Sequence, residues 1–198
     1  LVLSFLFLLL WELLSKISAI GTLISSPPEV GRALLNLIED KTTTGYPVLL
    51  VHIATSLYRL ALAFLAAVGL GISLGALAGR SKIAYKFFDP LVTVLMPVPG
   101  IAWAPLFLVW LGFGNPTIIT VGIIAAFFPI FYNTASGVRS VDKNLIRAAE
   151  IMGVNARAKF LKVYLPGAAA HILTGLKLGL ARCWRTIIAV EMIAASLW

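Results

Sequence analysis

Several long stretches of this chain are hydrophobic on every side, so they have no polar face to present to water. The longest of them lie at residues 1–11, 60–79, 91–112, 117–138 and 186–198. A helix that is hydrophobic all round belongs in a protein core or a membrane, and about 20 apolar residues are needed to cross about 30 Å of hydrocarbon. The pattern predicts an all-α integral membrane protein.

Residues 1–198 are expected to form one transmembrane domain with five membrane-spanning helices, at about 1–15, 57–79, 90–112, 117–138 and 167–195. The first span is expected to lack its beginning, since the chain opens directly on an apolar run. Between the first two spans, a short helix at about 28–41 would place Val30, Leu34, Leu37 and Ile38 on one face. That spacing is typical of a helix lying in the membrane interface.

The basic residues predict an orientation. They gather in two connections, as Arg80, Lys82 and Lys86 at 80–89, and as Arg139, Lys143, Arg147, Arg157, Lys159 and Lys162 at 139–165. Two spans separate these connections, so both lie on one side, which the positive-inside rule makes the cytoplasm. The N-terminus is then cytoplasmic as well. Because the net charge of +8 sits between spans rather than on one exposed face, it does not indicate nucleic-acid binding.

The polar residues offer little for catalysis or metal binding. Cys183 is the only cysteine, and the two histidines, His52 and His171, are far apart. The chain therefore predicts no disulfide, no metal site and no bound cofactor. It also lacks a Gly-Lys-Ser/Thr loop that could hold a nucleotide phosphate.

The second span carries a stripe of small residues. Gly71, Gly75 and Gly79 are four residues apart, and Ala63 and Ala67 extend the same helical face. Small side chains let two helix backbones approach closely inside a membrane. We expect this face to pack against another span.

The third span is interrupted by Pro90, Pro97, Pro99, Gly100 and Pro105. Each interior proline removes a backbone hydrogen bond, and a carbonyl freed at membrane depth must face protein or a water-filled cavity. Residues 96–100, followed by Trp103, are therefore a candidate wall of a translocation pathway. The alternative is a kink held by neighbouring helices without contact to a solute.

The last span contains Lys177, Arg182, Arg185 and Glu191. Charges inside a membrane normally face a partner charge or a polar pathway. Arg182 and Arg185 share one helical face and could attract an anionic solute. The alternative is a structural role, paired with Glu191 or with a carbonyl on a missing span. Arg59 is expected to extend to the membrane surface. The candidate pathway residues are Pro97, Pro99, Trp103, Arg182, Arg185 and Glu191.

The segment at about 140–166 predicts two short helices on the cytoplasmic side. Asp142 can cap a helix through Met152, and Gly153 suits the left-handed turn that ends it. Asn155 can cap a second helix to Tyr164, and Pro166 would mark the return to the membrane. The apolar residues of the first helix would be exposed without a soluble partner; they are Leu145, Ile146, Ile151 and Met152.

This segment resembles the coupling segment of bacterial binding-protein-dependent ABC importer permeases, whose signature reads EAA, then G, then LP. The matching residues are Arg147, Ala148, Ala149, Gly153, Leu165 and Pro166. Arg147 stands where the family pattern has Glu, and Glu150 is the nearby carboxylate. The resemblance implies that the coupling helices, at about 143–162, dock in a groove on an ATPase.

The rest of the chain is similar to the subgroup of these permeases that imports sulfonates, taurine, nitrate and bicarbonate. The similar stretches are 26–28 (Ser-Pro-Pro), 56–59 (Ser-Leu-Tyr-Arg), 71–75 (Gly-Ile-Ser-Leu-Gly), 99–105 (Pro-Gly-Ile-Ala-Trp-Ala-Pro), 128–133 (Phe-Pro-Ile-Phe-Tyr-Asn) and 182–191 (Arg-Cys-Trp-Arg-Thr-Ile-Ile-Ala-Val-Glu). Their order and spacing cover nearly the whole chain.

The resemblance implies a type I ABC importer transmembrane domain of six spans, five of them visible here, in the bacterial inner membrane. It also implies a second permease copy in a homodimer, two ABC ATPase subunits that bind ATP and Mg, and a periplasmic or lipid-anchored substrate-binding protein. This chain would then be a permease rather than an enzyme. Its expected solute is small and anionic or zwitterionic.

Two other functions stay open on the residues alone. The proline-broken third span and the intramembrane charges also suit a fragment of an ion-coupled secondary transporter, although such proteins usually show paired broken helices. A membrane-embedded enzyme would need clustered His, Asp or Glu, and only Glu191 lies deep in a span.

Overall fold

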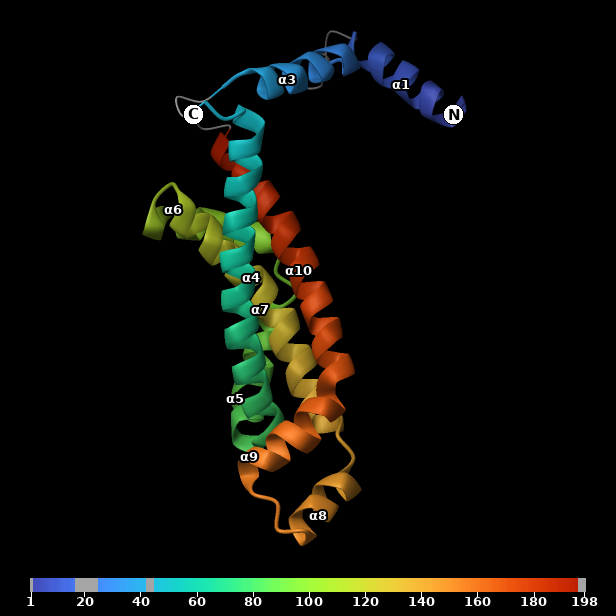
Figure 1. Cartoon of the computed structure of the whole chain (residues 1–198). Helices are drawn as coiled ribbons and strands as arrows, with labels where there is room; N and C mark the ends of the chain where they lie inside the picture. Colours follow the sequence, from blue (N-terminus) through green and yellow to red (C-terminus); the bar gives the residue numbers. More distant parts are fainter. Residues whose placement is uncertain (1, 17–24, 42–44, 196–198) are drawn as a thin grey trace. The chain divides into compact units, whose positions relative to one another are not determined.

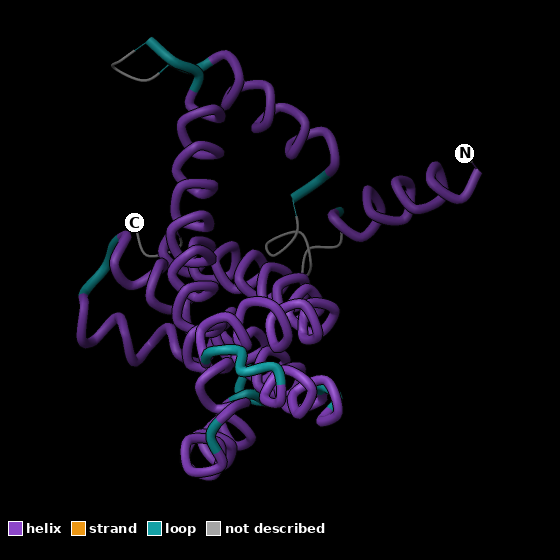
Figure 2. The backbone as a smooth tube through the Cα atoms, turned by 60° about the horizontal axis from the view of Figure 1, so that its bottom comes forward, coloured by secondary structure: helices purple, strands orange, loops and turns teal. Residues whose placement is uncertain are grey.

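A computed structural model describes residues 2–16, 25–41 and 45–195. Within these ranges the chain consists of helices and connections, with no strand beyond one isolated bridge between Lys41 and Pro47 (Figure 2). The predicted all-α class is confirmed. The chain divides into two compact units, Leu1–Thr55 and Ser56–Trp198, which we describe separately.

The first unit contains α1 (Val2–Ser15), α3 (Pro27–Glu39) and the first turns of α4. α1 has 14 residues, which reach about 21 Å and so fall short of a bilayer core. The expected first span at 1–15 therefore stays a prediction. Within this unit the indole Nε1 of Trp11 donates to the carbonyl of Ser25 at 3.0 Å.

The helix expected at 28–41 is confirmed as α3. Its start follows from local chemistry, because two prolines occupy the first positions, where no N–H is required. The backbone N–H of Ser26 donates to the Glu29 carboxylate at 2.9 Å. The predicted apolar face is exposed, and its location in a membrane interface stays a prediction.

The second unit is built around three long helices, α4 (Val48–Arg80), α7 (Asn115–Ser140) and α10 (Leu165–Ala195), which run alongside one another (Figure 1). The predicted small-residue face of α4 packs against α7. A Cβ added at Gly71 would lie 2.7 Å from Cγ2 of Ile130, and one added at Gly75 would lie 2.7 Å from the Phe131 carbonyl. Only glycine allows this separation between the two helices.

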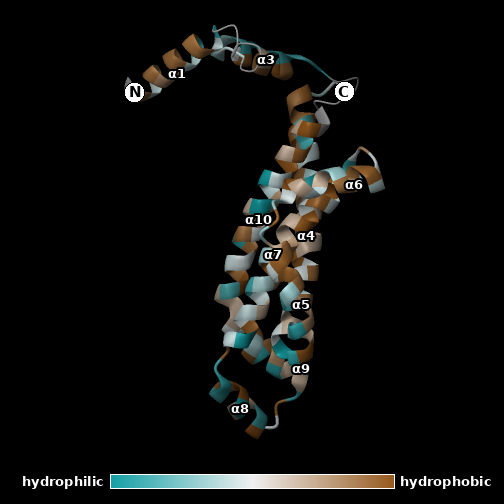
Figure 3. Cartoon of the chain, turned by 180° about the vertical axis from the view of Figure 1, so that it is seen from behind, coloured by the Kyte–Doolittle hydropathy of each residue, from teal (hydrophilic) through white to brown (hydrophobic). Residues whose placement is uncertain are grey.

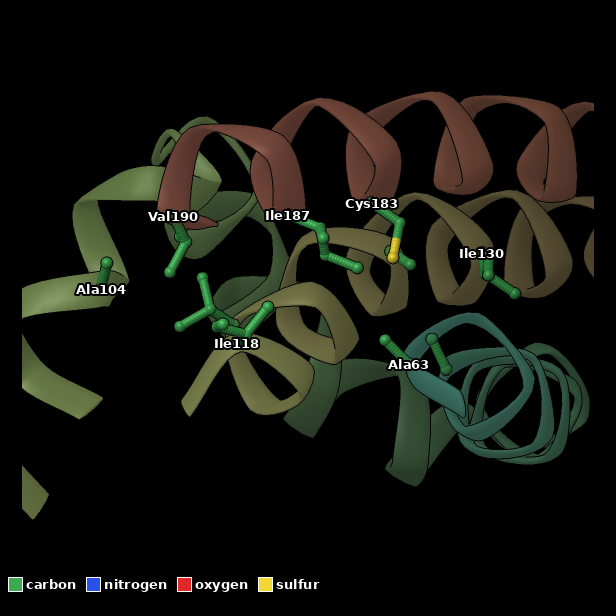
Figure 4. Packing of buried hydrophobic residues seen from close by; sticks show 10 residues of the cluster. Ala63, Ala104, Ile118, Ile130, Cys183, Ile187 and Val190 are labelled. Carbon is green, nitrogen blue, oxygen red and sulfur yellow. The ribbon is translucent and has the colours of Figure 1, made fainter. Parts of the chain in front are cut away.

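The core of the second unit lies where these three helices meet. Figure 4 shows Cys183 and Ile187 of α10 pointing toward α7, with Ile118 and Ile130 of α7 and Ala63 of α4 in the same cluster. All five side chains are buried. The small residues of α4 and the branched residues of α7 and α10 therefore fill one shared interior.

Length and composition identify α4, with 33 residues, and α7, with 26, as candidate membrane spans among the described residues. α10 has 31 residues but is less apolar, because it carries four charged side chains. Figure 3 shows hydrophobic residues over much of α4 and both hydrophobic and hydrophilic residues on the short helix α8 (Lys143–Ile151). The expected five-span count stays a prediction.

The connection expected at 80–89 is largely helical instead. α4 ends at Arg80 and α5 (Lys82–Leu95) begins two residues later. Ser81 stabilises this corner because its hydroxyl accepts from the N–H of Ala84 at 3.3 Å, which satisfies a free donor at the start of α5. The expected third span at 90–112 therefore begins inside a helix that starts at Lys82.

Candidate functional site

The predicted break in the third span is confirmed. α5 ends at Leu95, a short 3₁₀-helix occupies Gly100–Trp103, and α6 covers Ala104–Leu111. The two halves are bent by 97°. Pro97 and Pro99 have no N–H to continue the helix, so the chain turns between the halves.

The other two prolines of this segment do not cause the break. Pro90 lies inside α5, which continues through it, and Pro105 lies in the first turn of α6. A proline in a first turn costs little because that N–H has no intrahelical partner.

α10 contacts this break through Arg182. Its guanidinium Nη1 donates to the carbonyl of Met96 at 3.0 Å. The carbonyls at a helix end lack intrahelical partners, and Met96 directly follows the last residue of α5. Arg182 therefore satisfies a carbonyl of the broken third span, whereas the structural alternative stated above was Glu191 or a carbonyl on a missing span.

A cavity of about 440 Å³ lies between the break, α7 and α10. It is lined by the predicted pathway residues Pro97, Pro99, Trp103, Arg182 and Arg185, together with Met96, Val98, Gly100, Ile101, Ile124, Ala125, Phe128, Thr186 and Ala189. The structure thus brings the predicted pathway residues together, with the exception of Glu191. The cavity combines an apolar wall from α7 with two guanidinium groups from α10.

Gly100 permits the closest approach in this region. A Cβ added there would overlap Oγ1 of Thr186 and would lie 3.0 Å from the Cβ of Ala125. Thr186 belongs to α10 and Ala125 to α7. The 3₁₀ turn can therefore sit against both helices only because residue 100 has no side chain.

Glu191 belongs to a second polar cluster, outside the cavity lining. Its carboxylate pairs with Arg59 Nη1 at 2.6 Å and accepts from Ser56 Oγ at 2.8 Å. Arg59 Nε also donates to Asn115 Oδ1 at 2.7 Å. The cluster joins α4, α7 and α10.

This cluster corrects one expectation and refines another. Glu191 pairs with Arg59 and not with Arg182 or Arg185. Arg59 is 21% exposed and carries an ion pair, and its expected position near the membrane surface stays a prediction. Arg59 and Glu191 lie 132 positions apart in the sequence, so no local spacing links them. The available signal was their opposite charge within predicted spans, where charges tend to pair.

The predicted caps of the segment at 140–166 are confirmed. Asp142 Oδ1 accepts from the N–H of Asn144 at 2.8 Å, at the start of α8. Gly153 has φ 70°, the left-handed value expected after the helix. Asn155 Oδ1 accepts from the N–H of Ala158 at 2.8 Å and begins α9 (Ala156–Lys159).

The second predicted helix continues without interruption into the long last helix. α9 is followed by a π-helix at Phe160–Tyr164, and α10 begins at Leu165. The N–H of Leu165 donates to the carbonyl of Phe160, five residues earlier. A wide turn of this kind accommodates Pro166, which cannot donate a backbone hydrogen bond. Pro166 therefore does not interrupt the helical path.

α8 presents apolar residues on its surface, as expected. Ile151 is 87% exposed and Met152 is 71% exposed, while Ala149 is buried. The Glu150 carboxylate pairs with Lys159 Nζ of α9 at 2.6 Å. Glu150 thus holds the two short helices together across the Gly153 turn.

Arg80 links the end of α4 to the π-helix. Its guanidinium lies 5.4 Å from the ring centre of Phe160 and 5.6 Å from that of Tyr164. Arg139, at the end of α7, lies 3.9 Å from the ring centre of Tyr85 in α5. Residues predicted only to set orientation therefore also pack on aromatic rings; sequence reasoning missed these contacts.

Apolar helices, a break lined by two arginines, and a helix pair leading directly into a long helix are the features that the permease resemblance implied. Residues 67–197 match the family described as binding-protein-dependent transport system inner membrane component. The chain belongs to this family. The predicted class of ABC importer permeases with a type I transmembrane fold is confirmed.

Named relatives cover most of the chain. It is 36% identical over 191 residues to the taurine transport system permease protein TauC of Escherichia coli (strain K12), which covers 96% of this chain and 69% of the relative. It is 34% identical over 190 residues to the nitrate import permease protein NrtB of Synechocystis sp. (94% and 68%). It is 31% identical over 200 residues to the bicarbonate transport system permease protein CmpB of the same organism (96% and 69%). The chain thus spans about two thirds of their length.

Proposed function

We propose that this chain forms the translocation pathway of an ATP-driven importer for a small anionic or zwitterionic solute, and couples that pathway to a separate ATPase. The relatives named above carry taurine, nitrate or bicarbonate in their names. These solutes share a small oxyanion group. The cavity beside the broken span offers two arginines, which match oxyanion geometry well.

The observation that carries this proposal is the continuity between the coupling segment and the cavity. α9, the π-helix and α10 follow one another without a gap, and Arg182 and Arg185 of α10 line the cavity. A displacement of α8 can reach α9 through the Gly153 turn and the Glu150–Lys159 pair, and from α9 it can pass along one continuous helical path to the cavity wall. Rigid-body motions of this kind are a common way to switch a transporter between states.

The proposed partners follow from the exposed surfaces and from the family. Two ABC ATPase subunits, which would bind ATP and Mg, dock on the apolar tip of α8 around Ile151 and Met152. A second permease copy completes the pathway, and a periplasmic or lipid-anchored binding protein delivers the solute. The 140–166 segment lies in the cytoplasm, where its basic residues are favoured. The N-terminus lies on the same side, because two expected spans separate it from the basic connection at 80–89. Membrane lipids surround the spans.

The first test replaces Gly153 with valine in the transporter reconstituted with its ATPase and binding protein. A β-branched residue is strained at φ 70°, so the turn between α8 and α9 should reorganise. We expect ATP-dependent uptake of taurine or nitrate to fall at least about tenfold while ATP hydrolysis continues. The chain offers a matched control in Gly112, which has φ 71° and, like Gly153, no neighbour within 4 Å of an added Cβ.

Gly112→Val also places a β-branched residue at a positive φ, but outside the coupling segment, so it should leave uptake coupled to hydrolysis. Full ATP-dependent uptake in Gly153→Val would contradict the coupling role. Uptake driven by a sodium or proton gradient without any ATPase would instead favour the secondary-transporter alternative.

A further inference from the structure

Arg182 and Arg185 line the same cavity but have different surroundings. Arg182 is half-buried, and its Nη1 is engaged by the Met96 carbonyl at 3.0 Å. Arg185 is exposed to the cavity side, and its Nε donates to Ala181 of its own helix at 3.1 Å. Within the described ranges, neither guanidinium forms an ion pair with a carboxylate. Arg182 therefore donates to the backbone at the break, whereas the terminal nitrogens of Arg185 remain available to donate to a ligand.

The surroundings leave the charge of Arg185 uncompensated. Glu191 is the only carboxylate of α10, and Arg59 already neutralises it. The α7 wall of the cavity is apolar, made by Ile124, Ala125 and Phe128. A cation without a carboxylate partner attracts an anion that enters the cavity, and the apolar α7 wall strengthens this attraction where it excludes water.

We propose that this cavity is an oxyanion-binding site in which Arg185 binds the anion and Arg182 acts as a positioning residue. The ligand class is a small planar or tetrahedral oxyanion, such as nitrate, bicarbonate or the sulfonate group of a zwitterion. The inference rests on the proposed function, since it assigns the solute-binding group of the same pathway. The volume of about 440 Å³ lies within the usual range for small-ligand sites.

The role of Arg182 is to hold in place the wall of the cavity that is formed by the turn between α5 and α6. Its bond to Met96 ties α10 to the turn that carries Pro97 and Pro99. Without it the carbonyl of Met96 would lose a charge-assisted hydrogen bond. The turn would then be free to move away from Arg185, so the loss of Arg182 acts on the anion through the shape of the cavity.

Ala189 provides a reporter position for a direct test. It lines the cavity four residues after Arg185, so both lie on one face of α10. The single native cysteine, Cys183, is buried, and Cys183→Ala gives a background without a thiol. The reporter is the Ala189→Cys variant in the reconstituted transporter, and the measurement is its rate of reaction with N-ethylmaleimide. The rate is compared in sodium nitrate, in sodium ethanesulfonate and, as a bulky control at equal ionic strength, in sodium gluconate.

We expect nitrate and ethanesulfonate to slow the reaction about tenfold relative to gluconate, and Arg185→Gln to remove the protection. Arg185→Lys should keep part of it, because the charge remains but the planar fork is lost. Lys177→Gln is the matched control: it removes a positive charge from α10 outside the cavity lining, and protection should be unchanged. Equal protection with and without Arg185, or none in the parent, would overturn the proposal.

The positioning role of Arg182 has its own readout. Arg182→Gln should raise the reaction rate of the reporter in gluconate alone, because the cavity wall loosens, whereas Arg185→Gln should not. Arg182→Lys, which can still donate to Met96, should restore the parent rate. An unchanged rate in Arg182→Gln would contradict this role.

A second measurement avoids the Cys183→Ala background. In the otherwise unchanged chain, Arg185→Gln should lower nitrate uptake about tenfold while binding-protein-stimulated ATP hydrolysis is kept. If Gly153→Val uncouples the transporter but Arg185→Gln leaves uptake intact, the oxyanion site is refuted and the proposed function stands. If uptake needs no ATPase at all, the proposed function itself fails.

Discussion

Two faces of α7 differ in how they meet their neighbours. Against α4, three glycines bring the backbones together; a Cβ added at Gly79 would lie 2.6 Å from the Cβ of Val138. Against residues 182–189 of α10 and the broken span, the packing opens into a cavity lined by prolines and arginines. The face of α7 toward α4 is a close helix–helix contact, whereas the face toward α10 and the broken span borders a cavity with polar groups.

The same contrast appears along α10 itself. In its middle, Gly175 and Gly179 approach α7 closely; a Cβ added at Gly179 would lie 2.8 Å from Cγ1 of Ile130. Further along, Arg182 and Arg185 line the cavity. One helix therefore combines a tightly packed segment, suited to transmit a displacement, with a segment suited to bind a solute.

The largest effect is expected from disrupting the close face with Gly75→Val. The added Cβ would lie 2.7 Å from the Phe131 carbonyl, a backbone atom of α7 that cannot move aside easily. We expect a loss of about 3 kcal/mol in stability, measured by thermal unfolding in detergent. Gly69→Val is the control, since nothing lies within 4 Å of a Cβ at Gly69 in the same helix. Equal losses in both variants would show that helix propensity, rather than packing, is responsible.

A smaller effect is expected from breaking the polar cluster that joins the three helices. Glu191→Ala leaves Arg59 without its 2.6 Å partner in a region where both side chains are about one fifth exposed. We expect a loss of about 2 kcal/mol, measured by unfolding in nanodiscs. In a double-mutant cycle, Arg59→Ala added to Glu191→Ala should cost little more. Additive losses would mean that the two residues act independently.

The smallest effect is expected at the contact between the broken span and α10. Gly100→Ala places a Cβ against Oγ1 and Cγ2 of Thr186, so we expect a loss of about 1 kcal/mol and reduced uptake. Thr186→Ala removes both of these atoms, and the double variant should recover most of the stability. Failure of the second substitution to rescue the first would place the strain elsewhere, for example at Ala125.

Much of the local structure could be predicted because its causes are local. The caps at Asp142, Gly153 and Asn155 each depend on groups within three residues, and the break at 96–99 follows from proline chemistry. The glycine stripe of α4 follows from helical periodicity. The corner at Ser81 was missed, because a polar stretch with three basic residues is typical of a loop and one hydroxyl cap was enough to begin a helix there.

The amino-acid order alone was sufficient for the helical membrane class, the broken span and the capped helices after Asp142 and Asn155, because hydrophobicity, period and turn chemistry act over a few positions. The permease family followed from the resemblance of whole motifs. The amino-acid order could not show which charges meet. Arg59 pairs with Glu191, and Arg182 with the carbonyl of Met96, across 132 and 86 positions. Such pairings depend on the depth and rotation of whole helices, which are set by how α4, α7 and α10 pack together.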